Sequence, residues 1–287
     1  MHPAAGRMRG AHARMRVVTD LPRPDRERLS ALGALVLLAI ALVRVVILPT
    51  LPFEFAVAGL LIRVEVNRAV VLVGLAAAVT VAGADWLARS HPRGPQGWAR
   101  LEHVIIPGLA TLATGAILTR IEPGPGLWVG LALAAGLLLA VLVAEFVVID
   151  PQDPRRMTAL IGLTALAQIL LTGVYFALLS LGVRAFFSIP LSFVATASVA
   201  WRLLRLRLPE SRPALYAVAI GLGVAQLMWG MYYLPLAAFQ PALVLGLIAY
   251  LAIQTTVSLL RQRLTRARAL EYAAVAGLGM VGVFLLT

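Results

Sequence analysis

Long apolar runs separated by short polar segments constrain the fold of this chain more than any other feature. A helix needs roughly 17–25 mostly apolar residues to cross a bilayer, and nine runs approach that length. They lie at about 30–48, 68–88, 103–120, 127–149, 157–181, 186–203, 213–234, 239–260 and 270–287. We therefore predict an all-α polytopic membrane protein with about nine transmembrane helices.

The composition excludes an ordinary soluble enzyme. Of the 287 residues, 61% are hydrophobic and 13% are charged, whereas a soluble domain has about 45–50% apolar and about 25% charged residues. The chain has no cysteine, which excludes disulfides, thiolate metal sites and cysteine nucleophiles.

The basic residues indicate how the chain is oriented. All 25 are arginine, and the net charge is +12. A nucleic-acid-binding face would gather them on one soluble surface, but they fall in short clusters between the apolar runs, so we expect no nucleic-acid partner. With a cytoplasmic N-terminus, 20 of the 25 lie in cytoplasmic segments. The positive-inside rule then predicts a cytoplasmic N-terminus and an extracytoplasmic C-terminus. We interpret the chain as a bacterial inner (plasma) membrane protein in this orientation.

Two segments differ from the rest of the chain. Residues 1–29 contain seven arginines, and Pro22 and Pro24 lie near the end of this segment. This composition predicts a basic cytoplasmic tail that is disordered or lies on anionic lipid. Residues 30–287 form the predicted helical bundle. Between its first two helices, apolar and charged residues alternate over about 53–67. This alternation predicts a short extracytoplasmic β-hairpin, with a loop at the membrane interface as the alternative.

Similar strings recur at intervals of about 55 residues. AQILLTGVYFALL at 167–179 is similar to AQLMWGMYYLPL at 225–236, and RLLRLRL at 202–208 is similar to SLLRQRL at 258–264. These strings suggest three repeated helical hairpins, a construction found in transporters and in bundles that transport nothing. Chance similarity between Leu- and Ala-rich helices is the alternative.

Ionisable residues at the predicted cytoplasmic level are candidates for chemistry, because charge near hydrocarbon is costly. The candidate catalytic residues are Asp85, Glu102, His103 and Glu145. Together they could bind a divalent cation, relay protons or act on a lipid headgroup. Structural roles are the alternative: Asp85 could pair with Arg89 one turn later, and Glu102 could complement a helix dipole. Glu145 is the strongest candidate, because it lies deepest and lacks an oppositely charged partner one turn later.

Polar residues at helical spacing form a second candidate site, for substrate binding. The candidates are Gln168 and Tyr175 in one predicted helix, Gln226 and Tyr233 in another, and Gln254 in a third. They could line a substrate pathway. Alternatively they form hydrogen bonds between helices, which is their usual role in membrane proteins.

Two Gly-Leu-Gly triplets favour close helix packing. They are Gly221 to Gly223 and Gly277 to Gly279. Small residues at such positions let a second helix approach closely, so we expect contacts with the lipid bilayer and with other membrane-protein helices.

The sequence lacks the motifs that would indicate a cofactor or a metal. It contains no phosphate-binding GxxxxGK[ST] loop, no GxSxG and no aspartate-rich magnesium-diphosphate motif. His91 and His103 are the two histidines outside the tail, and their spacing does not match a zinc motif. We therefore expect no cofactor and no metal.

Several strings resemble a known family. ADWLARSHP at 84–92 follows the FEF…VEVN segment, and YYLPL at 232–236 and LEY at 270–272 occur near the end of the chain. Together they are similar to an uncharacterised family of small bacterial multi-pass membrane proteins. The resemblance covers most of the chain outside the arginine-rich tail, and it implies the architecture but no activity.

These observations favour a non-enzymatic accessory or assembly component of the membrane, whose helices bind partner helices. Two alternatives stay open. One is a transporter for a small solute or a lipid, and the other is a lipid-modifying enzyme that uses the candidate carboxylates and His103.

Overall fold

The computed structural model describes residues 24–45, 51–57, 60–66, 68–97, 99–180, 185–208, 213–262 and 264–285. Most of the predicted basic tail, residues 1–23, lies outside the described residues. The last part of that tail is helical, because the first described helix begins at Arg26, a few residues before the predicted boundary.

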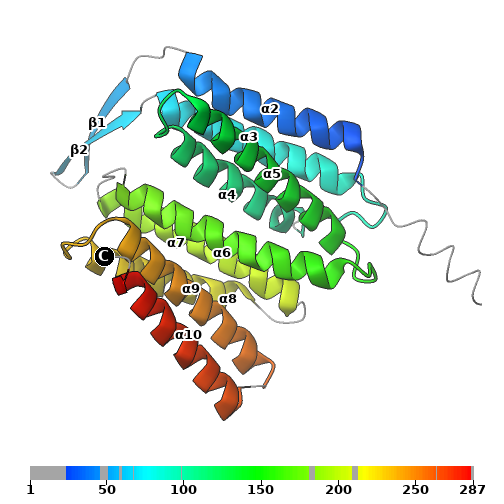
Figure 1. The fold of residues 1–287 in the computed structure, drawn as a ribbon, viewed down its shortest axis with the longest axis vertical. Helices are drawn as coiled ribbons and strands as arrows, with labels where there is room; N and C mark the ends of the chain where they lie inside the picture. The colour runs from blue at the N-terminus through cyan, green and yellow to red at the C-terminus, as the bar shows by residue number, and fades with distance from the viewer. Residues whose placement is uncertain are drawn as a thin grey trace, which may run out of the picture.

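Nine helices make up nearly all of the described residues, and each coincides with one predicted apolar run (Figure 1). They are α2 (Arg26–Val45), α3 (Arg68–Arg89), α4 (Ala99–Leu118), α5 (Pro125–Val148), α6 (Arg156–Ser180), α7 (Ala185–Arg207), α8 (Pro213–Met231), α9 (Phe239–Leu260) and α10 (Arg266–Leu285). Apolar runs of this length form helices in a bilayer because a helix satisfies its own backbone hydrogen bonds.

Seven of these helices, α3 to α9, are long and apolar enough to cross a membrane. The described parts of α2 and α10 are not in this set. Both begin with charged residues, Arg26 to Arg28 in α2 and Arg266, Arg268 and Glu271 in α10. The chain is thus a multi-pass membrane protein with seven candidate spans. Of the nine predicted spans, the first and the last are not long and apolar enough in their described parts to be counted.

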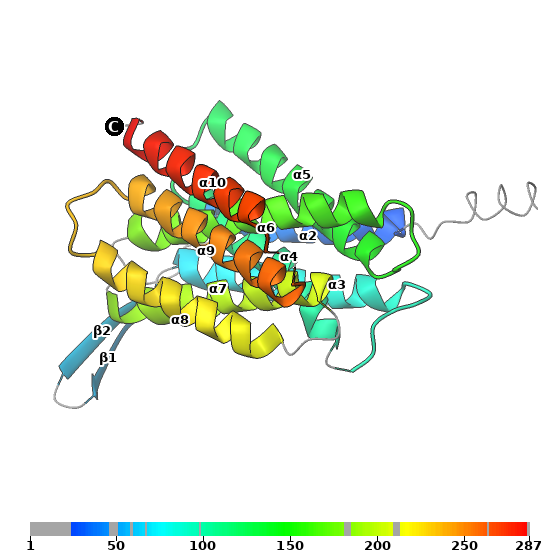
Figure 2. The ribbon, with the colours of Figure 1, turned by 90° about the horizontal axis from the view of Figure 1, so that it is seen from below.

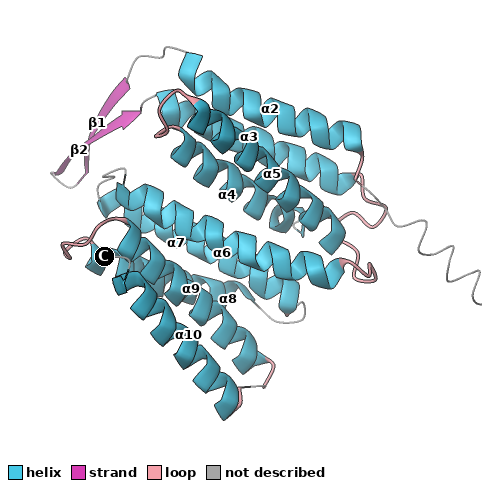
Figure 3. Ribbon diagram, viewed as in Figure 1, coloured by secondary structure: helices cyan, strands magenta, loops and turns pink. Residues whose placement is uncertain are grey.

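Two short strands connect α2 and α3. Strand β1 (Leu51–Val57) pairs antiparallel with β2 (Leu60–Val66), and Leu51 lies opposite Val66. The strands lie in the segment whose alternation predicted a hairpin or an interfacial loop. Figure 3 shows them as the strand element at one end of a helical molecule.

The helices lie side by side with their ends at two levels (Figures 1 and 2). Helix α4 packs against α3, α5, α6 and α7, and α10 packs against α9 at the edge. The hairpin marks one end of the bundle. The start of α2, the end of α3, the start of α6 and the end of α7 lie at the other end.

Glycines allow two helix pairs to pack closely. A Cβ atom on Gly115 of α4 would lie 2.8 Å from Val73 of α3, and one on Gly246 of α9 would lie 2.1 Å from the hydroxyl of Thr172 of α6. No other residue fits at these positions without movement of its neighbour, which is the role of small residues in membrane helix packing.

Candidate functional site

A group of charged residues lies inside the bundle where α4, α5 and α7 meet. We call Glu102, His103, Glu145, Arg202 and Arg205 the buried charge cluster. Its centre is almost inaccessible, with Arg202 2% and Glu145 4% exposed. Three of its members, Glu102, His103 and Glu145, are candidates identified from the sequence.

Arg202 on α7 makes the central contacts of the cluster. Its Nε donates to Glu145 Oε1 at 3.2 Å, and its Nη2 donates to Glu145 Oε2. Its Nη1 lies 3.7 Å from Glu102 Oε2. Arg205, one turn further along α7, donates from Nε to Glu102 Oε1 at 3.1 Å. Bidentate pairing of this kind is among the strongest side-chain interactions in proteins.

His103 contacts the two atoms, Glu145 Oε2 and Arg202 Nη2, that also bond to each other. Its Nδ1 lies 2.9 Å from Glu145 Oε2 and 2.9 Å from Arg202 Nη2. A protonated Nδ1 donates to the carboxylate, whereas a deprotonated Nδ1 accepts from the guanidinium. His103 therefore bonds to either Glu145 or Arg202, depending on whether Nδ1 carries a proton. Either bond keeps its ring inside the cluster.

The buried charge cluster is balanced in charge, and its centre at Glu145 and Arg202 is buried. Two carboxylates face two guanidinium groups, and such pairing offsets the large cost of burying each charge. The cavity beside His103 and Glu145 measures about 10 Å³ and has apolar walls that include Leu142 and Phe146. A single water needs at least about 10–15 Å³. This cavity therefore has room for one water at most.

Asp85 lies apart from this cluster. It pairs with Arg89 on the same helix, where the side chain of Arg89 is 56% exposed. Pairing with Arg89 is the structural alternative that the sequence analysis gave for Asp85. Asp85 and Arg89 also line a groove between α3 and α4.

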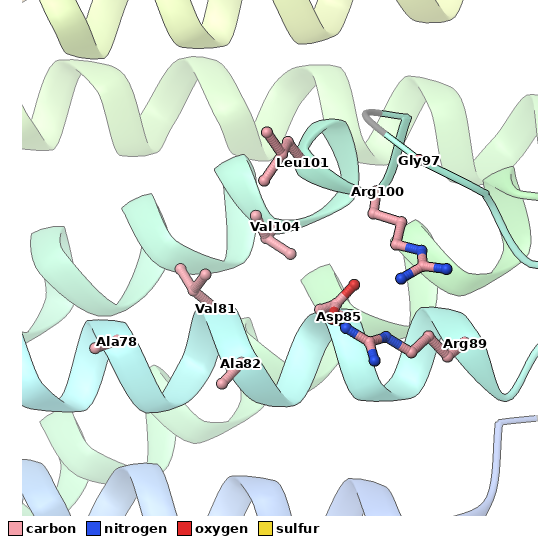
Figure 4. Close-up of a pocket in the computed structure, with 9 residues that line it drawn as sticks. All are labelled: Ala78, Val81, Ala82, Asp85, Arg89, Gly97, Arg100, Leu101 and Val104. Atoms are coloured by element: carbon pink, nitrogen blue, oxygen red, sulfur yellow. Dashed lines mark hydrogen bonds and ion pairs between the residues drawn. The ribbon is translucent and has the colours of Figure 1, made fainter.

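The groove between α3 and α4 has a volume of about 630 Å³, far larger than the cavity beside Glu145. Its walls include Ala78, Val81 and Leu101, and Arg89 and Arg100 lie at one end. Figure 4 shows the apolar side chains along the two helices and the charged ones together at their ends.

Sequence reasoning missed Arg202 and Arg205. Their string, RLLRLRL, was interpreted as part of a cytoplasmic arginine cluster, whereas α7 continues to Arg207 and carries both side chains into contact with α4 and α5. Glu145 inside an apolar run and Glu102 at the start of another need cationic partners. The requirement for cationic partners was a signal that could have identified these arginines. Arg202 and Arg205 are three residues apart, so they lie on one face of α7 and can both meet the carboxylates.

The predicted substrate-binding residues differ in burial. Tyr175 is fully buried, and its hydroxyl lies 2.6 Å from Thr196 Oγ1. Gln226 is exposed, and Tyr233 is 76% exposed. None of the five candidates is among the residues that line the groove or the small cavity.

The remaining two candidates make contacts between helices. Gln168 of α6 donates from Nε2 to the carbonyl oxygen of Gly246 in α9. Gln254 of α9 accepts a hydrogen bond from Arg207 of α7, which also donates to Thr164 Oγ1 of α6 at 3.1 Å. These contacts join α6, α7 and α9, which is the interhelical role left open by the sequence.

Ionisable residues in the segments that connect the helices also pair. Arg93 pairs with Asp150. Arg155 lies 2.7 Å from Asp153, and its hydrogen bonds lower the pKa of that carboxyl. Burial lowers the pKa of His91, whose ring packs edge-on against Phe146 at 4.7 Å between centroids. Within the described ranges, no group of three or more acidic or histidine residues is arranged to hold a metal ion.

Residues 48–286 match the sequence model of a family described as Protein of unknown function (DUF5656). The chain belongs to this family. The match includes the hairpin and the helices from α3 to α10, and it confirms the resemblance to an uncharacterised family. No curated protein and no solved structure matches the chain.

Proposed function

We propose that this chain is a non-enzymatic accessory or assembly component of the bacterial inner membrane. The observation that carries the proposal is the closed state of the buried charge cluster. Its carboxylates already bind Arg202 and Arg205, and the adjoining cavity of about 10 Å³ holds no substrate. An arrangement of this kind holds helices together, and it favours a structural role for α4, α5 and α7 over a catalytic one.

The glycine triplets support a partner-binding role. Cβ atoms on Gly221 and Gly279 would lie 3.0 Å from Ala197 and 2.6 Å from Leu247, so these two glycines pack inside the chain. Gly223 and Gly277 have no described atom within 4 Å of the same position. One glycine of each triplet is thus available to a helix of another protein.

Affinity purification from native membranes in mild detergent, followed by quantitative mass spectrometry, tests this role. We expect one partner protein at a fixed ratio to the chain, and we expect Gly223→Leu with Gly277→Leu to remove it. Leu222→Phe with Leu278→Phe is the matched control, because it adds bulk at neighbouring exposed positions. Equal partner recovery from both variants, or no partner with the wild type, would contradict the proposal.

We also propose that all nine helices cross the membrane, with the N-terminus in the cytoplasm. The end of α3, the start of α6 and the end of α7 each carry arginine. They lie at the end of the bundle opposite the hairpin (Figure 1), which fits the positive-inside rule. Because the chain has no cysteine, single cysteines report orientation cleanly. An impermeant maleimide should label Glu122→Cys in intact cells and Gln152→Cys only after lysis, and the reverse pattern would refute this orientation.

The two alternatives have less support. A transporter needs a polar route, but Gln168 and Gln254 are engaged in contacts between helices. A lipid-modifying enzyme needs an accessible carboxylate. Asp85 is the candidate that lines an open groove, and its carboxylate is paired with Arg89.

A further inference from the structure

The groove between α3 and α4 has an apolar part and a charged end. Ala78, Val81 and Ala82 of α3 are exposed along one wall, and Leu101 of α4 is 45% exposed on the other. Since both helices are candidate spans, this part of the groove faces hydrocarbon. Its volume of about 630 Å³ lies within the range of roughly 300–1,000 Å³ that is usual for ligand sites.

The charged end carries one excess positive charge. Arg89 and Arg100 contribute two guanidinium groups, and Asp85 contributes one carboxylate. Asp85 pairs with Arg89, while Arg100 donates from Nε to the carbonyl oxygen of Pro95 at 3.2 Å. Figure 4 shows the guanidinium of Arg100 above Asp85 and Arg89 at the mouth of the groove. A single phosphodiester would balance these three charges.

The charged end lies at the level where lipid headgroups occur. Helix α3 ends at Arg89 and α4 begins at Ala99, so both arginines stand at the ends of candidate spans. Trp86, one turn before the end of α3, is 47% exposed and lies 4.5 Å from the guanidinium of Arg28. Exposed tryptophan is typical of the membrane–water interface. The groove therefore runs from the interface into the bilayer.

We propose that this groove binds one anionic phospholipid. The phosphate lies between Arg89 and Arg100, and one acyl chain lies along Ala78, Val81 and Ala82. Arginine binds phosphate with strong, charge-assisted hydrogen bonds, and the alanines leave space for the chain. A zwitterionic lipid brings its own cation to a site with an excess positive charge, so the groove discriminates between the two headgroup classes. This site does not depend on the proposed protein partner.

Native mass spectrometry of the purified full chain tests the site. The protein is incubated with mixed micelles that contain either a phosphatidylglycerol or a phosphatidylcholine with the same acyl chains. We expect one tightly retained phosphatidylglycerol per chain and at least about tenfold weaker retention of phosphatidylcholine, which corresponds to about 1.4 kcal/mol.

Two pairs of variants separate the groove from general surface charge. Arg89→Gln with Arg100→Gln should weaken retention of phosphatidylglycerol about tenfold or more. The control is Arg266→Gln with Arg268→Gln at the start of α10, which removes the same formal charge elsewhere and should leave retention unchanged.

A third variant keeps every charge and fills the apolar part. Ala82→Leu should lower retention of phosphatidylglycerol, whereas Ala132→Leu, at an exposed position of α5, should not. Equal retention of the two lipids, equal effects of the two arginine pairs, or full retention by Ala82→Leu would each overturn the proposal.

Discussion

Removing one partner from the pair between Glu145 and Arg202 should destabilise the protein far more than removing both. In Glu145→Leu, Arg202 stays 98% inaccessible and keeps a distant carboxylate, Glu102 at 3.7 Å, in addition to His103. In Arg202→Met, Glu145 keeps His103 alone among its described partners. Both variants leave a buried charge poorly compensated.

The expected magnitude follows from the burial and the geometry of this pair. Breaking a buried ion pair by removing one partner costs about 3–5 kcal/mol, whereas replacing both with apolar residues of similar volume is often neutral or stabilising. In the double variant Glu145→Leu with Arg202→Met, Glu102 keeps its bond to Arg205 at 3.1 Å. We therefore expect each single variant to lose about 3–5 kcal/mol of unfolding free energy. The double variant should recover part of this loss, because it leaves the buried His103 Nδ1 without its two partners at a cost of about 1–3 kcal/mol.

Denaturation by sodium dodecyl sulfate in mixed micelles, followed by tryptophan fluorescence or circular dichroism, measures these free energies. Asp85→Asn is the matched control, because it breaks a more exposed ion pair and should change the free energy of unfolding by about 0–1 kcal/mol. Single variants as stable as the wild type would refute the reasoning. Additive losses in the double variant would show that the two residues do not act as a pair.

Three further variants test other parts of the structure. Gly246→Ala should lose about 1–3 kcal/mol of unfolding free energy, because its Cβ would lie 2.1 Å from the Thr172 hydroxyl; unchanged micelle denaturation would contradict this. Tyr175→Phe removes a buried hydrogen bond to Thr196 and should lose about 0.5–1.5 kcal/mol in the same assay. Burial lowers the pKa of His91 below its ordinary value of 6.5, so the unfolded chain takes up the proton first. Stability should therefore decline as pH falls below 6.5. The midpoint temperature of thermal unfolding should fall less with pH in His91→Phe than in the wild type.

Helix positions could be predicted from the sequence because bilayer thickness sets the length of each apolar run. The orientation of each helix about its axis could not. Gln168 and Gln226 occupy equivalent positions in similar strings, yet Gln168 bonds to α9 and Gln226 is exposed. When a helix is apolar on every side, its sequence gives no preferred inner face. Packing against neighbouring helices then decides which residues meet.

The candidate site was predictable where the relevant contact was local or the residue type was costly to bury. The pair of Asp85 with Arg89 follows from spacing on one helix. Glu145 was identified because a charge deep in an apolar run is costly and no opposite charge follows one turn later. The identity of that partner, Arg202, was missed. An arginine near a helix end contributes equally to the positive-inside count whether its side chain points into the bundle or toward water.

We propose that the buried charge cluster holds α4, α5 and α7 together and carries out no chemistry. The most direct test is to purify the double variant Glu145→Leu with Arg202→Met from native membranes and to compare its partner protein with that of the wild type. We predict the same partner at the same ratio, because assembly depends on the fold and not on these charges. A folded double variant that loses its partner or fails to support the host would contradict the claim and assign a direct role to the charges.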